Sequence, residues 1–212
     1  MIAGGTKWGI SGFAGGRVAA VRIPPTFMVS DVSGPAMPRE NIVLQRITRD
    51  PTSAKDAEQV AGEILENPGR LPLLIEGLED PEDIIRAKTA HALERIADAS
   101  PELLANYVPT VTRLARSDPV PMVRLHMAII LGEIPVEPED LDRVIGTLEH
   151  LLAEDDNLFV KSWSIVSLTR IGMRVPTRKP GIVDAIWPFR EQGDGLLQAK
   201  AARAIEVLEA GG

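Results

Sequence analysis

The sequence predicts an all-α fold made of repeated helix pairs, and three observations lead to that expectation. From about Thr52 onward apolar residues recur every three or four positions, which is the period of a helix with one buried face. Polar–proline dipeptides interrupt this pattern, as expected where helices begin with an N-cap and a first-turn proline. The sequence has no alternating run of β-branched residues bounded by hairpin turns, so it gives little support for a sheet. The dipeptides are Asp50-Pro51, Asp80-Pro81, Ser100-Pro101, Asp118-Pro119 and Glu137-Pro138.

Four of the helical segments align in a single register. They cover residues 83–97, 121–135, 158–172 and 196–210. Their apolar positions form three columns, in which successive members are 37 or 38 residues apart. The columns are Ile85, Val123, Val160 and Leu197; Leu93, Leu131, Leu168 and Ile205; and Ile96, Ile134, Ile171 and Leu208. One register for four helices indicates an internal repeat.

Further amphipathic segments lie between the aligned ones and complete the pairs. They cover Leu71–Leu78, Pro101–Ala115, Pro138–Ala153 and Pro180–Phe189. A period near forty residues with two helices in each repeat is typical of a helical solenoid, in which each repeat buries its apolar face against its neighbours. The helix expected over Thr52–Asn67 does not follow the column register, so we expect it to cap the first repeat.

Asp80 followed by Ile85-Arg86, and Asp118 followed by Val123-Arg124, resemble the HEAT repeat pattern over roughly residues 52–210. The resemblance implies a right-handed superhelical solenoid of about four helix pairs. It also implies that aspartate and arginine tie neighbouring repeats together in a polar ladder. The ladder residues would be Asp80, Arg86, Asp118, Arg124, Asp155 and Lys161. Lysine in place of arginine at position 161 loses the bidentate fork, and the fourth repeat has only Asp194 near the corresponding place.

Residues 1–40 differ from the rest, since they are rich in glycine, proline, serine and valine and have no sustained period. We expect a flexible leader there and a repeat domain over residues 41–212. The net charge of −7 comes from the repeat domain, because the leader has four basic and two acidic residues. An acidic body argues against nonspecific binding to nucleic acid or anionic membranes.

Other sequence features bear on compartment and chemistry. The absence of cysteine excludes disulfides and thiolate catalysis and fits a reducing cytoplasm. No apolar run approaches the roughly 18 to 20 residues of a membrane-spanning helix. The three histidines, His91, His126 and His150, do not share a pattern with enough acidic residues to hold a metal ion. We therefore expect a cytoplasmic, non-catalytic protein that needs no metal or cofactor.

A second stripe of residues on the aligned helices lies opposite the core columns. In the solenoids that this chain resembles, the second helix of each pair lines the concave face. The stripe begins at Ile84, Met122, Phe159 and Leu196, and its middle is apolar and aromatic while its ends are basic. Its candidate binding residues are Lys88, His91, Arg95, Met122, His126, Ile129, Phe159, Trp163, Arg170, Lys200 and Arg203. Such a composition favours a groove for a protein or peptide of acidic character.

Two other interpretations of this stripe stay open at the level of sequence. Met122, Ile129 and Phe159 could pack against neighbouring helices while the charged side chains are simply solvated. The basic residues could instead bind nucleic acid, as in the alkylpurine DNA glycosylases, which are also built on helical repeats. The acidic body and the small number of aromatic residues make that alternative weaker than a protein-interaction scaffold.

Overall fold

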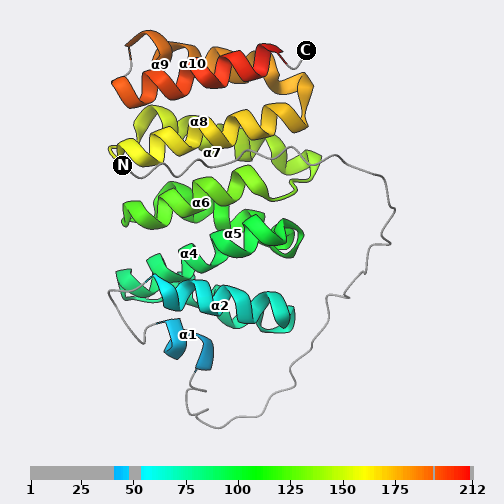
Figure 1. Ribbon diagram of the computed structural model, residues 1–212, viewed down its shortest axis with the longest axis vertical. Coiled ribbons are helices and arrows are strands. Elements are labelled where there is room, and N and C mark those ends of the chain that lie inside the picture. The colour runs from blue at the N-terminus through cyan, green and yellow to red at the C-terminus, as the bar shows by residue number, and fades with distance from the viewer. Residues whose placement is uncertain (1–40, 48–53, 193, 211–212) are drawn as a thin grey trace, which may run out of the picture. The chain divides into compact units, whose positions relative to one another are not determined.

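Every regular element that the structure describes is a helix (Figure 1). The computed structural model describes residues 41–47, 54–192 and 194–210, and no strand occurs within these ranges. The predicted all-α class is thus confirmed. The leader expected over residues 1–40 lies outside the described residues. Within the described ranges no helix combines the length and the apolar character needed to cross a membrane.

Ten α-helices and four short 3-10 helices make up the described part of the chain. The α-helices are α1 (Ile42–Ile47), α2 (Lys55–Glu66), α3 (Leu71–Ile75), α4 (Asp83–Ala99), α5 (Val108–Ser117), α6 (Pro121–Glu133), α7 (Pro138–Glu154), α8 (Leu158–Arg174), α9 (Lys179–Gln192) and α10 (Gly195–Ala210). The 3-10 helices cover Pro68–Arg70, Glu76–Glu79, Pro101–Tyr107 and Pro176–Arg178. Each helical segment expected from the sequence is present, but those expected over Leu71–Leu78 and Pro101–Ala115 are divided between an α-helix and a 3-10 helix.

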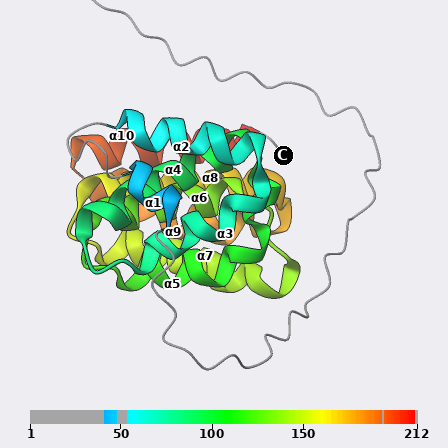
Figure 2. The same cartoon turned by 90° about the horizontal axis from the view of Figure 1, so that it is seen from below.

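The helices pack in two rows (Figure 2). In one row α4, α6, α8 and α10 pack side by side, and α2 packs against α4 at the start of the row. On the other side of the structure lie α3, α5, α7 and α9. Contacts of α5 with α6, α7 with α8 and α9 with α10 join the rows into helix pairs, so the predicted solenoid of repeated pairs is confirmed. We call the surface of α4, α6, α8 and α10 that carries the predicted stripe the second-helix face.

The three apolar columns form the core between the rows. Eleven of their twelve members are buried, and Ile85 at the start of α4 is half-buried. Each fully buried leucine or isoleucine contributes roughly 1.5–3 kcal/mol relative to an exposed one, so the columns account for much of the driving force for folding. The repeated register therefore reports burial correctly, because the same face of each second helix meets its pair partner.

The second-helix row is closely packed where α6 meets α8. A Cβ atom on Gly132 would lie 2.5 Å from Ser167 Oγ and 2.8 Å from Ser167 Cα. Ser167 Oγ in turn donates a hydrogen bond to the carbonyl oxygen of Ala128 at 2.7 Å. Only glycine at position 132 allows the two helices to approach this closely.

The aspartate–proline dipeptides do not all begin helices as predicted. Helix α4 begins at Asp83 rather than next to Asp80, and α6 begins at Pro121 rather than at Pro119. The side chains of Asp80 and Asp118 instead accept hydrogen bonds from the backbone N–H two residues later, at 2.9 Å and 2.8 Å. Each aspartate thus closes a turn before the helix, the local arrangement that this residue favours.

Helix α1 was not predicted, because six residues are too short to display a helical period. Its side chains Val43 and Ile47 are buried, and the helix packs against α2, α3 and α4. Asn41 caps it, since Asn41 Oδ1 accepts from the N–H groups of Val43 and Leu44 at 3.1 Å and 3.2 Å. Burial and a side-chain cap stabilise a helix that would be marginal alone.

Candidate partner-binding site

Arginine and aspartate side chains join the repeats along one edge of the structure. Arg86 Nε donates to Asp118 Oδ2 at 2.9 Å, and Arg124 Nε donates to Asp155 Oδ2 at 2.6 Å. A second nitrogen of each arginine donates to the other carboxylate oxygen, at 3.4 Å and 3.1 Å. Each arginine therefore forks onto the aspartate of the next repeat, and the fixed guanidinium geometry holds the two repeats in register.

The ladder also ties each arginine to its own repeat. Arg86 Nη1 donates to the carbonyl oxygen of Asp80 at 2.9 Å, and Arg124 Nη1 donates to that of Asp118 at 2.9 Å. Burial alone would raise the pKa of Asp155, but the hydrogen bond and the charge of Arg124 bring this pKa below its ordinary value. The side chains of Asp118 and Asp155 are almost fully buried, and each has an arginine of the preceding repeat as its partner of opposite charge.

The two outer members of the predicted ladder behave differently. No arginine among the described residues forks onto Asp80, whose carboxylate accepts from the N–H of Glu82. Lys161 Nζ donates to the carbonyl oxygen of Ala153 at 2.9 Å, within its own repeat. Asp194 accepts from the N–H groups of Leu196 and Leu197 and caps α10. The side-chain fork thus joins the described repeats at two seams, Arg86–Asp118 and Arg124–Asp155.

Two of the predicted binding residues are buried, which corrects the expectation that the whole stripe is open. Lys88 is 7% exposed, and its Nζ lies 3.8 Å from Asp56 Oδ2 on α2. Ile129 is also 7% exposed and lies one turn before Gly132, where α6 and α8 approach closely. Both side chains belong to the packing of the row rather than to an accessible groove.

The histidines of the stripe contact each other. The rings of His91 on α4 and His126 on α6 are stacked, with centroids 5.2 Å apart and planes inclined by 9°. Glu94 lies against His126 Nδ1 and also pairs with Arg95. Burial lowers the pKa of His91, and the neighbouring His126 lowers it further. The pair is half-buried and engaged in contacts between α4 and α6.

Trp163 on α8 is half-buried between two cations. Arg170 of the same helix lies 5.9 Å from the ring centroid, and Lys200 Nζ of α10 lies 5.7 Å from it. Arg170 also pairs with Glu133 of α6, whereas no carboxylate lies within ion-pair distance of Lys200 among the described residues. Cation–π contacts contribute roughly 0.5–1 kcal/mol at such sites and hold the ring in place.

Large apolar side chains are exposed at the beginnings of the second helices. Ile84 of α4 is 43% exposed, Met122 of α6 is 50% exposed and Phe159 of α8 is 61% exposed. These residues occupy equivalent positions in three successive repeats, and we call them the exposed column. For Met122 and Phe159 the sequence also allowed packing against neighbouring helices. Such packing does not account for their exposure. The remaining stripe residues, Arg95 and Arg203, are exposed and pair with Glu94 and Glu206.

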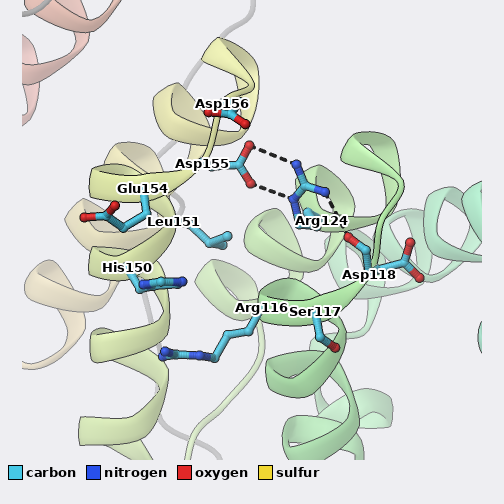
Figure 3. A pocket seen from close by; sticks show the side chains of 9 residues that line it. All are labelled: Arg116, Ser117, Asp118, Arg124, His150, Leu151, Glu154, Asp155 and Asp156. Atoms are coloured by element: carbon cyan, nitrogen blue, oxygen red, sulfur yellow. Dashed lines mark hydrogen bonds and ion pairs between the residues drawn. The ribbon is translucent and has the colours of Figure 1, made fainter.

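A shallow cavity of about 200 Å³ lies at the ladder edge, away from the stripe (Figure 3). Its wall includes the Arg124–Asp155 pair, and His150 and Arg116 face it from α7 and α5. The lining residues are Arg116, Ser117, Asp118, Arg124, His150, Leu151, Glu154, Asp155 and Asp156. The sequence assigned no role to His150, which is exposed. Within its wall Arg124 donates to the carboxylate of Asp155 and to the carbonyl oxygen of Asp118, so this part of the cavity belongs to the framework.

Hydroxyl side chains on α8 are engaged structurally. Ser164 and Thr169 donate to the carbonyl oxygens of Val160 and Ile165, at 2.9 Å and 2.7 Å. Helical serine and threonine commonly satisfy their hydroxyl groups in this way. No group of three or more histidine, aspartate or glutamate side chains in the described ranges is arranged to hold a metal ion.

Comparisons with known proteins bear on the repeats. Residues 71–169, from α3 into α8, match the family model of HEAT repeats, which confirms the resemblance seen in the sequence. The comparison with curated proteins found no match. A crystal structure of an engineered protein from the Northeast Structural Genomics Consortium is similar over 81% of this chain and 80% of its own, with a TM-score of 0.60 and 18% identity. At that identity the similarity shows the fold alone.

Proposed function

We propose that this chain, which carries HEAT repeats over residues 71–169, is a protein-interaction scaffold that binds a protein or peptide on its second-helix face. The observation that carries the proposal is the exposed column of Ile84, Met122 and Phe159. Isolated exposed apolar residues are ordinary, but one in each of three successive repeats makes a line along the face. Trp163, held between Arg170 and Lys200, adds an aromatic anchor beside this line.

The engaged state of the polar side chains supports a non-catalytic role. Among the described residues, the serine hydroxyl groups of α8 donate to backbone carbonyl oxygens, and no histidine contacts them. Glu94 and Glu133 are occupied by His126, Arg95 and Arg170. Nucleophilic catalysis needs a hydroxyl group within hydrogen-bond reach of a base, and the described ranges provide none.

Nucleic-acid binding is less well supported than protein binding. Duplex binding needs a dense array of available cations, because each phosphate contact replaces bound counterions. On the second-helix face the cations of Lys88, Arg95 and Arg170 lie close to Asp56, Glu94 and Glu133. This pairing lowers the charge that the face offers to a phosphate backbone. We further propose a cytoplasmic location, which rests on the composition of the chain.

Affinity purification of the tagged full-length chain from its native host, followed by mass spectrometry, tests the proposal. The matched variant combines Trp163→Ala with Lys200→Glu. Arg170 stays unchanged, because its loss would leave Glu133 without its cation. We expect the variant to lose the partners that the unaltered chain captures while its helical circular dichroism signal is retained. Equal capture by both chains would reject the second-helix face as the binding site.

A further inference from the structure

The seam between α4 and α6 is joined at two places along the helices. Near the helix beginnings, Arg86 forks onto Asp118. About 7.5 Å further along α4, the ring of His91 is stacked on that of His126, with centroids 5.2 Å apart and planes inclined by 9°. The first contact is an ion pair, whereas the second consists of two imidazole rings. Imidazole is the side-chain group whose charge changes most readily near neutral pH, so the two contacts respond differently to acid.

Charged groups from three helices act on the stack. Glu94 of α4 lies against His126 Nδ1 and also pairs with Arg95, so its carboxylate is shared between two neighbours. Other charged side chains of the stripe have partners of their own: Lys88 lies near Asp56 of α2, and Arg170 of α8 pairs with Glu133 of α6. The groups that act electrostatically on His91 come from α2, α4 and α6: Glu58, Glu94, Arg95 and His126.

The closed seam disfavours a proton on His91. Burial lowers the pKa of His91, and the neighbouring His126 lowers it further. Glu94 and Glu58 act in the opposite direction, but Glu94 is shared and Glu58 is exposed, so they do not outweigh the burial. A state in which the rings separate and His91 reaches water lacks both penalties. Below about pH 6.5 the open state therefore binds a proton more readily than the closed one, and acid shifts the balance toward it.

We propose that the stack of His91 on His126 is an acid-sensitive joint between two repeats. On mild acidification the rings separate and the seam between α4 and α6 opens, while the fork at the helix beginnings keeps the repeats joined. The fork is the pivot, since its two side chains, Arg86 and Asp118, include no imidazole. Helices α8 and α10 contain no histidine, so the joint is confined to this seam of the row. The inference goes beyond the proposed function, because the joint works with or without a partner.

Titration of the histidines followed by NMR tests whether the two rings are coupled. The full chain without a histidine tag has three histidines, and His150 on α7 is exposed and serves as an internal reference. The variant His126→Gln removes the neighbouring imidazole and keeps an amide that can donate to Glu94. We expect His91 to titrate at a higher pH in this variant and His150 to titrate as before. An unchanged titration of His91 overturns the coupled pair.

Hydrogen exchange of the unaltered chain tests the opening itself. Exchange is measured by mass spectrometry at about pH 7.5 and about pH 5.5, and the intrinsic pH dependence of amide exchange is divided out. We expect the protection of amides in α4 and α6 to fall at the lower pH by up to about tenfold, the most that one histidine of ordinary pKa near 6.5 contributes there. The amides of α8 and α10 are the control and should keep their protection. Equal protection of α4 and α6 at both pH values, or the same loss in all four helices, overturns the joint.

A matched pair of variants assigns the effect to the stack. His91→Gln removes the ring that takes up the proton, and His150→Gln is the control on α7. We expect the pH-dependent loss of protection in α4 and α6 to vanish in His91→Gln and to persist in His150→Gln. A loss that persists in folded His91→Gln overturns the assignment to this pair. Urea unfolding checks that the substituted chains are folded; if one is not, exchange of the unaltered chain decides alone. Capture of native partners enters none of these measurements, so this inference and the proposed function fail separately.

Discussion

The two halves of the second-helix row use similar residues in different ways. Around α4 and α6, polar groups are engaged between repeats: Arg86 forks onto Asp118, Lys88 is buried near Asp56, and His91 is stacked on His126. Around α8 and α10, Lys161 makes no fork to the next repeat, and Lys200 lies over Trp163 without a neighbouring carboxylate among the described residues.

This difference shows that a repeated position has no fixed role. Lys88 and Lys200 occupy equivalent positions, yet one is buried beside an acid and the other faces an aromatic ring. The polar residues in the first half of the row therefore join neighbouring repeats, which favours rigidity. The second half leaves an aromatic residue and a cation accessible, which favours recognition of a partner.

The largest expected effect comes from breaking the ladder in the first half. Asp118→Ala removes the buried carboxylate partner of the largely buried guanidinium of Arg86 and leaves it only the exposed Asp83, and we expect the free energy of unfolding to fall by about 3 kcal/mol. Asp194→Ala is the matched change in the second half, where only a helix cap is lost, and we expect a fall of about 1 kcal/mol. Urea unfolding measures both. Similar losses in the two variants would contradict the division between the halves.

The seam between the halves gives the next largest effect. Gly132→Ala places a methyl group against Ser167 and disturbs its hydrogen bond to Ala128, so we expect a loss of about 1–3 kcal/mol. Gly146→Ala on α7 serves as the control, because nothing lies within 4 Å of the added Cβ atom. We expect that control to be neutral or slightly stabilising in thermal unfolding. A neutral Gly132→Ala would show that α6 and α8 have room to move apart.

A smaller effect concerns the histidines of the first half. Because the pKa of His91 is lowered in the folded state, the folded protein binds fewer protons than the unfolded chain as the pH falls below about 6.5. The stability that this histidine contributes is therefore present above that pH and is lost as the pH falls through the lowered pKa. We expect His91→Gln to unfold with a weaker pH dependence between about pH 7.5 and about pH 5.5. The measurement is urea unfolding across that range. If the pH dependence of stability is unchanged in His91→Gln, other groups cause it.

The substitution with the smallest expected effect would make the second half of the row resemble the first. Lys161→Arg provides the guanidinium fork that the earlier repeats direct at the next aspartate, with Asp194 as its acceptor. Asp194 is exposed, so we expect a gain of only about 0.5 kcal/mol in the free energy of unfolding. A loss of stability would show that the contact of Lys161 with Ala153 is worth more than the fork.

The sequence predicted the fold well because burial follows the helical period. Val123, Val160 and Leu197 share a column and are all buried. The site was predicted less well, since accessibility depends on how neighbouring helices approach each other. Ile129 and Phe159 lie on the same stripe, but Ile129 is covered near the close contact of α6 with α8 and Phe159 is open.

Individual contacts between helices could not be predicted from the sequence for the same reason. His91 and His126 occupy different columns, and the packing of α4 against α6 brings their rings together. The helix starts after Asp80 and Asp118 were misplaced because the turn before each helix uses the aspartate side chain. The ladder, by contrast, was expected from the resemblance to HEAT repeats, and Arg124 donates both to the carbonyl oxygen of Asp118 and to the carboxylate of Asp155.

Methionine oxidation followed by mass spectrometry tests the central claim most directly, because two methionines are similarly exposed at different places. Met122 lies in the exposed column and is 50% exposed, while Met173 at the end of α8 is 44% exposed. Oxidation rates are compared for the full chain alone and with its captured partner. We predict that the partner slows oxidation of Met122 and leaves Met173 unchanged. Unaltered oxidation of Met122 in a saturated complex would contradict binding on the second-helix face.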